Sequence, residues 1–175
     1  RAWLKRHNGQ TKSEEEAAAF APGCNWLATA ATSASQWADD AEWATGDEDE
    51  DDTQCEGRVL NAVFHKQRIP IAGTKYWDQD KTYLDLAPGP KGVAGQVIAL
   101  VTECDFEVLG PSFDAFMERY VSFLEQGALM VKGPTELEPA DGEWDEHPAN
   151  WLAERLWPGA RPPRNDDDDD DTDES

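Results

Sequence analysis

The chain has 175 residues, of which 37 are acidic and 15 basic, so its formal net charge is −22. Hydrophobic residues make up 39% of the chain, below the usual share for a globular domain, which predicts that part of the chain does not pack. A charge of this size argues against binding to nucleic acid or to anionic membranes and favours basic proteins as partners.

The negative charge is concentrated in two runs. Asp47–Asp52 and Asp166–Asp171 each contain six consecutive acids, and Asp173 and Glu174 follow the second run. The other 23 acids and the 15 bases leave the rest of the chain with a net charge of −8. Each run either keeps the chain in solution or attracts a basic partner, and the sequence leaves both interpretations open.

Cysteine usage and hydropathy predict a cytoplasmic protein. Cys24, Cys55 and Cys104 are odd in number and widely spaced, which argues against a disulfide framework and a zinc site. No apolar run approaches the length of a transmembrane helix, and no signal peptide is visible. The first nine residues, RAWLKRHNG, predict the end of a helix closed by Gly9, so we expect a fragment whose N-terminal helix is truncated.

The first internal helix is predicted over residues 33–44. Small and aromatic residues recur there at helical spacing, with Ser33 or Ser35 as the N-cap. The expected apolar stripe consists of Ala34, Trp37, Ala38 and Ala41. The run Asp47–Asp52 ends any ordered element, because its like charges repel one another.

Strand signals dominate the middle of the chain. Residues 58–64 fit a helix or a strand, whereas residues 68–72 predict an edge strand, because Pro70 cannot donate to a ladder. Residues 82–86 alternate, with Leu84 and Leu86 on one face and Tyr83 and Asp85 on the other. Residues 96–101 and 105–109 predict a hairpin with its turn at 102–104.

The clearest helix begins after Pro111. Ser112 is its expected N-cap and Gly127 its C-terminal stop. The predicted core stripe consists of Phe113, Phe116, Met117, Tyr120, Phe123 and Leu124. Residues 133–147 are predicted to form a linker, residues 150–158 a short amphipathic helix that docks on the body or binds a partner, and residues 158–175 a disordered tail.

The glycine-rich stretch 82–98, TYLDLAPGPKGVAGQVI, raises the question of nucleotide binding. Gly89, Gly92 and Gly95 lack the spacing of a phosphate-binding loop, and a predicted strand follows them where a helix is required. The loop therefore predicts a turn between strands. The acid runs lack the pattern of a calcium loop, and no nucleophile elbow is present, so no metal, cofactor or catalytic residue is assigned.

The order of these elements resembles the SUKH superfamily of Smi/Knr-type proteins. The resemblance covers residues 1–131, with residues 45–56 as an acidic insertion, 132–160 as a linker and helix, and 161–175 as an acidic tail. The matching residues are Trp3, Leu4, Lys5, Arg6, His7, Asn8, Gly9, Tyr83, Leu84, Asp85, Pro88, Gly89, Pro90, Gly95, Gln96, Val97, Ile98, Ser112, Phe113 and Phe116. Ala87 departs from the family pattern, which usually has a second acid there.

The resemblance implies an α+β fold with a mostly antiparallel sheet flanked by helices. It also implies a protein-binding function without catalysis, either neutralising a toxin as an immunity protein does or regulating cell-wall assembly or signalling as a hub. The expected contact residues are Tyr76, Trp77, Asp78, Asp80 and Asp85, because aromatic and acidic groups cluster there beside a turn. The alternatives are core packing for Trp77 and, for Asp85, bonds to the backbone amides of the following turn. A hydrolase and an acidic, chaperone-like binder that works through the tail are the alternatives.

Overall fold

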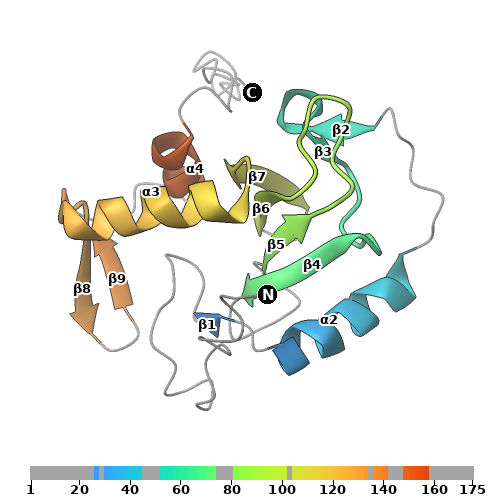
Figure 1. The fold of residues 1–175 in the computed structure, drawn as a ribbon, viewed down its shortest axis with the longest axis horizontal. Coiled ribbons are helices and arrows are strands. Elements are labelled where there is room, and N and C mark those ends of the chain that lie inside the picture. The colour runs from blue at the N-terminus through green and yellow to red at the C-terminus, as the bar shows by residue number, and fades with distance from the viewer. Residues whose placement is uncertain are drawn as a thin grey trace, which may run out of the picture.

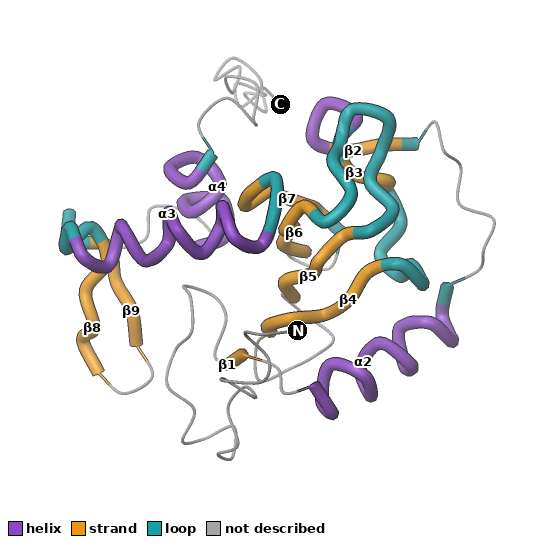
Figure 2. Tube along the Cα trace, viewed as in Figure 1, coloured by secondary structure: helices purple, strands orange, loops and turns teal. Residues whose placement is uncertain are grey.

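The protein is described here from a computed structural model that covers residues 26–27, 30–44, 52–73, 81–101, 104–133, 136–141 and 148–157. These residues form an α+β fold with helices packed on antiparallel sheets, which confirms the predicted fold class. The predicted N-terminal helix end, the run Asp47–Asp51 and the tail at 161–175 lie outside the described residues. Figure 2 shows the helices placed around a central group of strands.

A five-stranded sheet in the order β1-β4-β5-β6-β7 organises the fold, and all its pairings are antiparallel. Helices α3 and α4 lie at the β6–β7 end of this sheet and α2 lies beside β4 (Figure 1). The elements are β1 Trp26–Leu27, α2 Ala30–Trp43, β2 Thr53–Gln54, the short turn η1 Cys55–Gly57, β3 Val59–Leu60, β4 Arg68–Gly73, β5 Lys81–Asp85, β6 Gln96–Val101, β7 Asp105–Gly110, α3 Phe113–Glu125, β8 Leu129–Gly133, β9 Glu136–Pro139 and α4 Pro148–Leu156.

Strand β6 is buried along its whole length, and apolar from Val97 to Val101, because both faces of the sheet are covered. Val97, Ala99 and Val101 point into a core shared with α3 and α4. Ile98 and Leu100, which alternate with them, point into a second core beside β3. Side chains of successive strand residues face opposite sides of a sheet, so one strand serves both cores.

The helix α3 confirms its sequence prediction. The Ser112 hydroxyl accepts a hydrogen bond from the Ala115 amide at 3.2 Å, which caps the first turn. Phe116 and Tyr120 are buried, and the other stripe residues pack partly buried against the same core. Gly127 ends the helix with a φ of +71°, a conformation that glycine adopts without steric cost.

Residues from earlier in the chain lie along the outer sides of both β4 and β7. On the β4 side, β1 pairs with Ala72 and Gly73, and the Ser33 hydroxyl donates to the Pro70 carbonyl at 2.6 Å. On the β7 side, the Gln54 amide accepts from Phe106 N at 2.8 Å and donates to the Cys104 carbonyl at 2.9 Å. The Gln54 side chain therefore bonds the β7 edge as a neighbouring backbone would.

Several sequence predictions need correction. Strand β4 lies second in the sheet, although β1 leaves the outer side of Pro70 without a paired strand, as a proline requires. The predicted linker over 133–147 contains β9, which pairs with β8 as a hairpin. The open choice at 58–64 resolves into the two-residue strand β3, and β2 lies within the predicted insertion 45–56.

The helix α4 docks on the body, as one of the two sequence interpretations expected. Trp151, Leu152 and Leu156 are buried in the core that α3 also lines. The guanidinium of Arg119 on α3 donates to the Leu156 carbonyl at the end of α4. The apolar face of α4 is thus used for packing within the chain.

Candidate functional site

The predicted contact surface is corrected at the one position that the structure describes. Tyr76, Trp77, Asp78 and Asp80 lie outside the described residues. Asp85 is 0% exposed, so in this fold its carboxylate cannot touch a partner. The prediction was based on acidic and aromatic groups clustered beside a turn, but β5 is covered on both faces.

Asp85 instead holds the turn that follows it. Its carboxylate accepts from Gln96 Nε2 at 2.9 Å and from the Ala87 amide at 3.1 Å. Arg68 Nε lies 3.7 Å from the same carboxylate, and the Arg68 guanidinium stacks over the Phe106 ring at 4.5 Å. Because Arg68 also donates to the Leu60 carbonyl at 2.7 Å, this ion pair connects β4, β5 and the β3–β4 segment.

The glycine-rich loop between β5 and β6 packs against η1, which confirms a turn between antiparallel strands. The Gly89 amide donates to the Arg58 carbonyl and the Lys91 amide to the Gly57 carbonyl, each at 2.9 Å. A Cβ atom on Gly89 would lie 2.5 Å from the Gly57 carbonyl oxygen. Gly89 is therefore required for the close approach of two backbones, a reason that the sequence analysis did not identify.

The turn η1 carries backbone strain beneath this loop. Cys55 and Glu56 have φ values of +52° and +58°, which non-glycine residues adopt at a cost of roughly 1–2 kcal/mol each. The Cys55 thiol donates to the Phe106 carbonyl at 2.9 Å, so a contact with β7 helps to hold the strained turn. The β5–β6 loop above it exposes Leu86 and Val93, which leaves apolar side chains on a fixed backbone.

The most exposed large aromatic residue among the described residues is Trp43, which is 72% exposed at the end of α2. Asp39 and Glu42 are also exposed. Glu42 and Trp43 follow Asp39 by three and four residues, which places the three side chains on one side of the helix. We call Asp39, Glu42 and Trp43 the α2 face. Its mixture of an aromatic ring and carboxylates is the chemistry that the sequence analysis expected at 76–85.

The predicted apolar stripe of α2 is wrong, and the reason lies in a long-range ion pair. Ala34 and Ala38 are exposed, whereas the side chain buried on this helix is Asp40. Ser33 and Ser35 lie inside the helix, which begins at Ala30, and cap nothing. The α2 face could have been predicted from the helical spacing of Asp39, Glu42 and Trp43, which precede an acid run.

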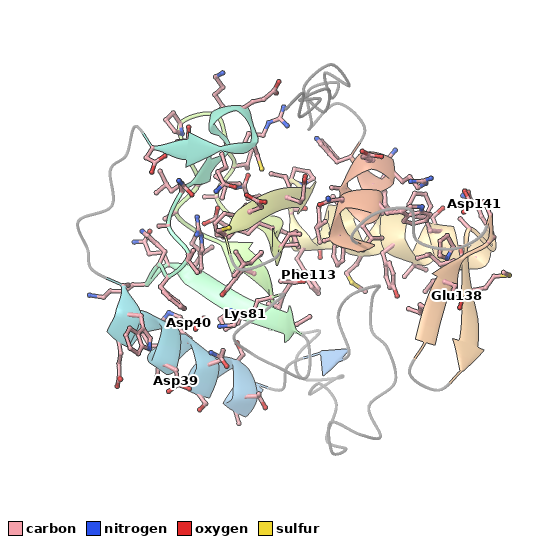
Figure 3. All side chains as sticks on the ribbon, turned by 180° about the vertical axis from the view of Figure 1, so that it is seen from behind. Asp39, Asp40, Lys81, Phe113, Glu138 and Asp141 are labelled. Atoms are coloured by element: carbon pink, nitrogen blue, oxygen red, sulfur yellow. The ribbon has the colours of Figure 1, made fainter. Side chains whose placement is uncertain are left out.

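Asp40 fixes α2 to the sheet through charged and polar contacts. Lys81 Nζ donates to its carboxylate at 2.9 Å and the Tyr83 hydroxyl lies 3.3 Å away. Gln36, one turn earlier, donates to the same carboxylate at 2.9 Å. In Figure 3, Asp40 and Lys81 lie between α2 and the sheet, whereas Asp39 lies on the outer side of the helix.

The Tyr83 hydroxyl stays protonated well above the usual pH range. Burial raises its pKa first of all, and the adjacent Asp40 carboxylate raises it further by its charge and as a hydrogen-bond acceptor. The positive charge of Arg68 acts in the opposite direction. A neutral hydroxyl can therefore donate to Asp40 while Lys81 compensates the charge of the same carboxylate.

A cleft of about 480 Å³ lies between the end of α3, the end of β9 and α4. Its lining residues are Phe123, Ala128, Ala140, Asp141, Trp151, Glu154 and Arg155. Arg155 stacks over the Trp151 ring at 4.1 Å and approaches Asp141 at 3.8 Å, so charged groups of the chain already interact across it. The hydrolase alternative needs a pocket that joins His7 or His65 to carboxylates. His7 lies outside the described residues, and His65, whose imidazole accepts from the Gln67 amide, does not line this cleft.

Within the described ranges, no group of three or more histidine, cysteine or acidic residues is arranged to hold a metal ion. None of the helices that the structure describes is long and apolar enough to cross a membrane. In comparisons with known proteins, no protein-family model and no curated protein matches this chain. The interpretation of its function therefore depends on its own residues.

Proposed function

We propose that this protein is a non-catalytic protein-interaction module that binds a basic partner through the α2 face. The observation that carries the proposal is the exposure of Trp43, at 72%, beside the exposed acids Asp39 and Glu42. Tryptophan is strongly enriched among the residues that dominate binding energy at protein interfaces. A large aromatic side chain left in water at the end of a docked helix suits that role.

The charge of the chain favours a basic partner. The acid run Asp47–Asp52 follows α2 after three residues, and the whole chain carries a net charge of −22. Such a charge speeds the encounter with a basic protein and makes the association sensitive to salt. The ring of Trp43 would then supply apolar contact area, while Asp39 and Glu42 would pair with lysine or arginine side chains.

The resemblance to Smi/Knr-type proteins supports the same class of function and offers two forms of it. In the first, the chain neutralises one partner tightly, as an immunity protein does. In the second, it is a regulatory hub that binds several basic partners loosely. We also propose a cytoplasmic location. The alternative function is that of an acidic chaperone-like binder in which the tail alone makes the contact.

A pull-down with charge-matched variants tests the proposal. The bait is the whole chain, incubated with lysate of its source cell at about 50 and about 500 mM salt, which differ strongly in screening. The test variant is Asp39→Lys/Glu42→Lys, and Trp43→Ala is its apolar counterpart. The control is Glu118→Lys/Glu125→Lys, which makes the same charge change at exposed positions of α3.

We expect the control to retain the basic partner and both α2 variants to lose it. Loss in the control as well would mean that overall charge alone attracts the partner, and the α2 face would be the wrong surface. A further variant without residues 165–175 separates the alternatives. Binding that disappears with this tail indicates the chaperone-like binder, one partner held at high salt indicates the immunity-like form, and several partners lost at high salt indicate the hub.

A further inference from the structure

The helix α2 is attached to the protein in a different way from α3 and α4. Neither of the two hydrophobic cores contains a residue of α2 among the described residues. The helix is held by the Ser33 bond to the Pro70 carbonyl, the Trp37 indole bond to the Lys66 carbonyl at 2.7 Å, and the Asp40 ion pair with Lys81. In contrast, α3 and α4 bury aromatic and aliphatic side chains in a shared core.

Polar attachment of this kind fixes the position of a helix better than it stabilises it. The Lys81–Asp40 pair is nearly fully buried, with side chains 4% and 6% exposed, so both charges have lost most of their hydration. The attraction between two buried charges roughly balances the cost of removing them from water. Hydrogen bonds that replace bonds to water add little, and no described residue of α2 contributes to either hydrophobic core, whose apolar burial dominates folding stability.

We infer that α2 is a releasable element, which detaches from β4 and β5 as a unit while the sheet, α3 and α4 stay folded. Regions with few buried apolar contacts open at lower free energy than the core of the same domain. A helix of 14 residues is marginal on its own in water, so release would also unwind it.

This inference rests on the proposed function and adds a means of regulating it. The side chains of the α2 face share a helix with Asp40, so opening would displace Trp43 from Asp39 and Glu42 at the same time. Opening would also uncover the Lys81 ammonium and the Tyr83 hydroxyl, which are buried in the docked form. A partner that needs the helical face would close the element, and one that takes the place of Asp40 would hold it open.

Native-state amide hydrogen exchange on the intact chain, without any partner, tests the inference. We expect the amides of residues 34–43 to exchange through a local opening that is insensitive to low urea. Amides of β6 and α3 should exchange only through an opening that grows with urea. If the α2 amides merge with those of β6 in one urea-dependent opening, α2 belongs to the global unit and the inference is wrong.

A pair of variants tests whether α2 opens separately from the sheet. Ile98→Val weakens a core contact that stays intact when only α2 opens, so we expect the β6 amides to exchange about fivefold faster while the α2 amides stay within about twofold. Asp40→Asn leaves Lys81 without its counter-charge in the docked form, so the α2 amides should exchange about tenfold faster or more, whereas Glu118→Gln makes the same chemical change at an exposed position of α3 and should not speed them. Equal acceleration of α2 and β6 by Ile98→Val, or unchanged exchange of the α2 amides in Asp40→Asn, would refute the inference.

Two further arrangements keep the test decisive. If Asp40→Asn does not fold, Trp37→Phe removes the indole N–H that donates to the Lys66 carbonyl and should speed exchange of the α2 amides. Unchanged exchange of these amides would count against the inference. The exchange experiment contains no partner, so a result that refutes the opening of α2 does not bear on partner binding. Conversely, a pull-down that refutes partner binding does not bear on the opening of α2.

Discussion

Replacing Gly89 by alanine is expected to cost far more than an ordinary glycine substitution. The added Cβ would lie 2.5 Å from the Gly57 carbonyl oxygen, 3.1 Å from the Gly57 carbonyl carbon and 3.2 Å from the Arg58 carbonyl carbon. All three atoms belong to the backbone, so no side-chain rotation can relieve the overlap. Overpacking of this kind costs up to about 3 kcal/mol, and reduced freedom of the unfolded chain offsets about 0.7 kcal/mol of it.

The free energy of unfolding should therefore fall by about 2 kcal/mol, measured from urea unfolding curves with an unchanged slope. Gly127→Ala is the matched control, because its Cβ meets nothing within 4 Å and only the φ of +71° opposes it. Its expected cost is about 0.5 kcal/mol after the same offset. If both variants lose the same stability, the close approach of the β5–β6 loop to η1 does not constrain the fold as argued.

Two further predictions concern the buried polar residues of β5. Asp85→Ala should lower the free energy of unfolding by about 3–5 kcal/mol in the same urea assay, because it leaves the buried Arg68 charge without its counter-ion; a loss below about 1 kcal/mol would contradict the role given to this pair. For Tyr83 the raised pKa means that the unfolded state loses the phenol proton first, near the ordinary pKa of 10.0. The resulting loss of stability as the pH rises above about 10 should be smaller in Tyr83→Phe, compared by urea midpoints at about pH 9 and about pH 11, and an equal loss in both proteins would refute the assignment.

Elements with local signals were predicted well. Ser112, the aromatic stripe and Gly127 lie within one stretch of chain, and together they specify α3 without help from elsewhere. The β6–β7 hairpin follows from two apolar runs separated by a short turn. In each case the residues that decide the structure are close neighbours in the sequence.

The errors arose where the deciding partner is distant in the sequence. Asp40 is buried because Lys81, 41 residues later, pairs with it, and no periodicity within α2 reveals that partner. Asp85 was expected either to contact a partner or to bond to the following turn, and the choice depended on the buried Arg68, which composition does not reveal. The need for Gly89 likewise depends on the backbone of Gly57, which approaches only in the folded state.

The side chains of Ser33 and Gln54 bond to the outer sides of β4 and β7, and this has a consequence for how the chain emerges from the ribosome. Both residues are synthesised before the strands whose edges they occupy: Gln54 precedes Cys104 by 50 residues and Ser33 precedes Pro70 by 37. When β7 leaves the exit tunnel, the group that covers its outer edge is already available. The interval in which a newly made strand could pair with another chain is thereby shortened, which lowers the risk of aggregation during translation.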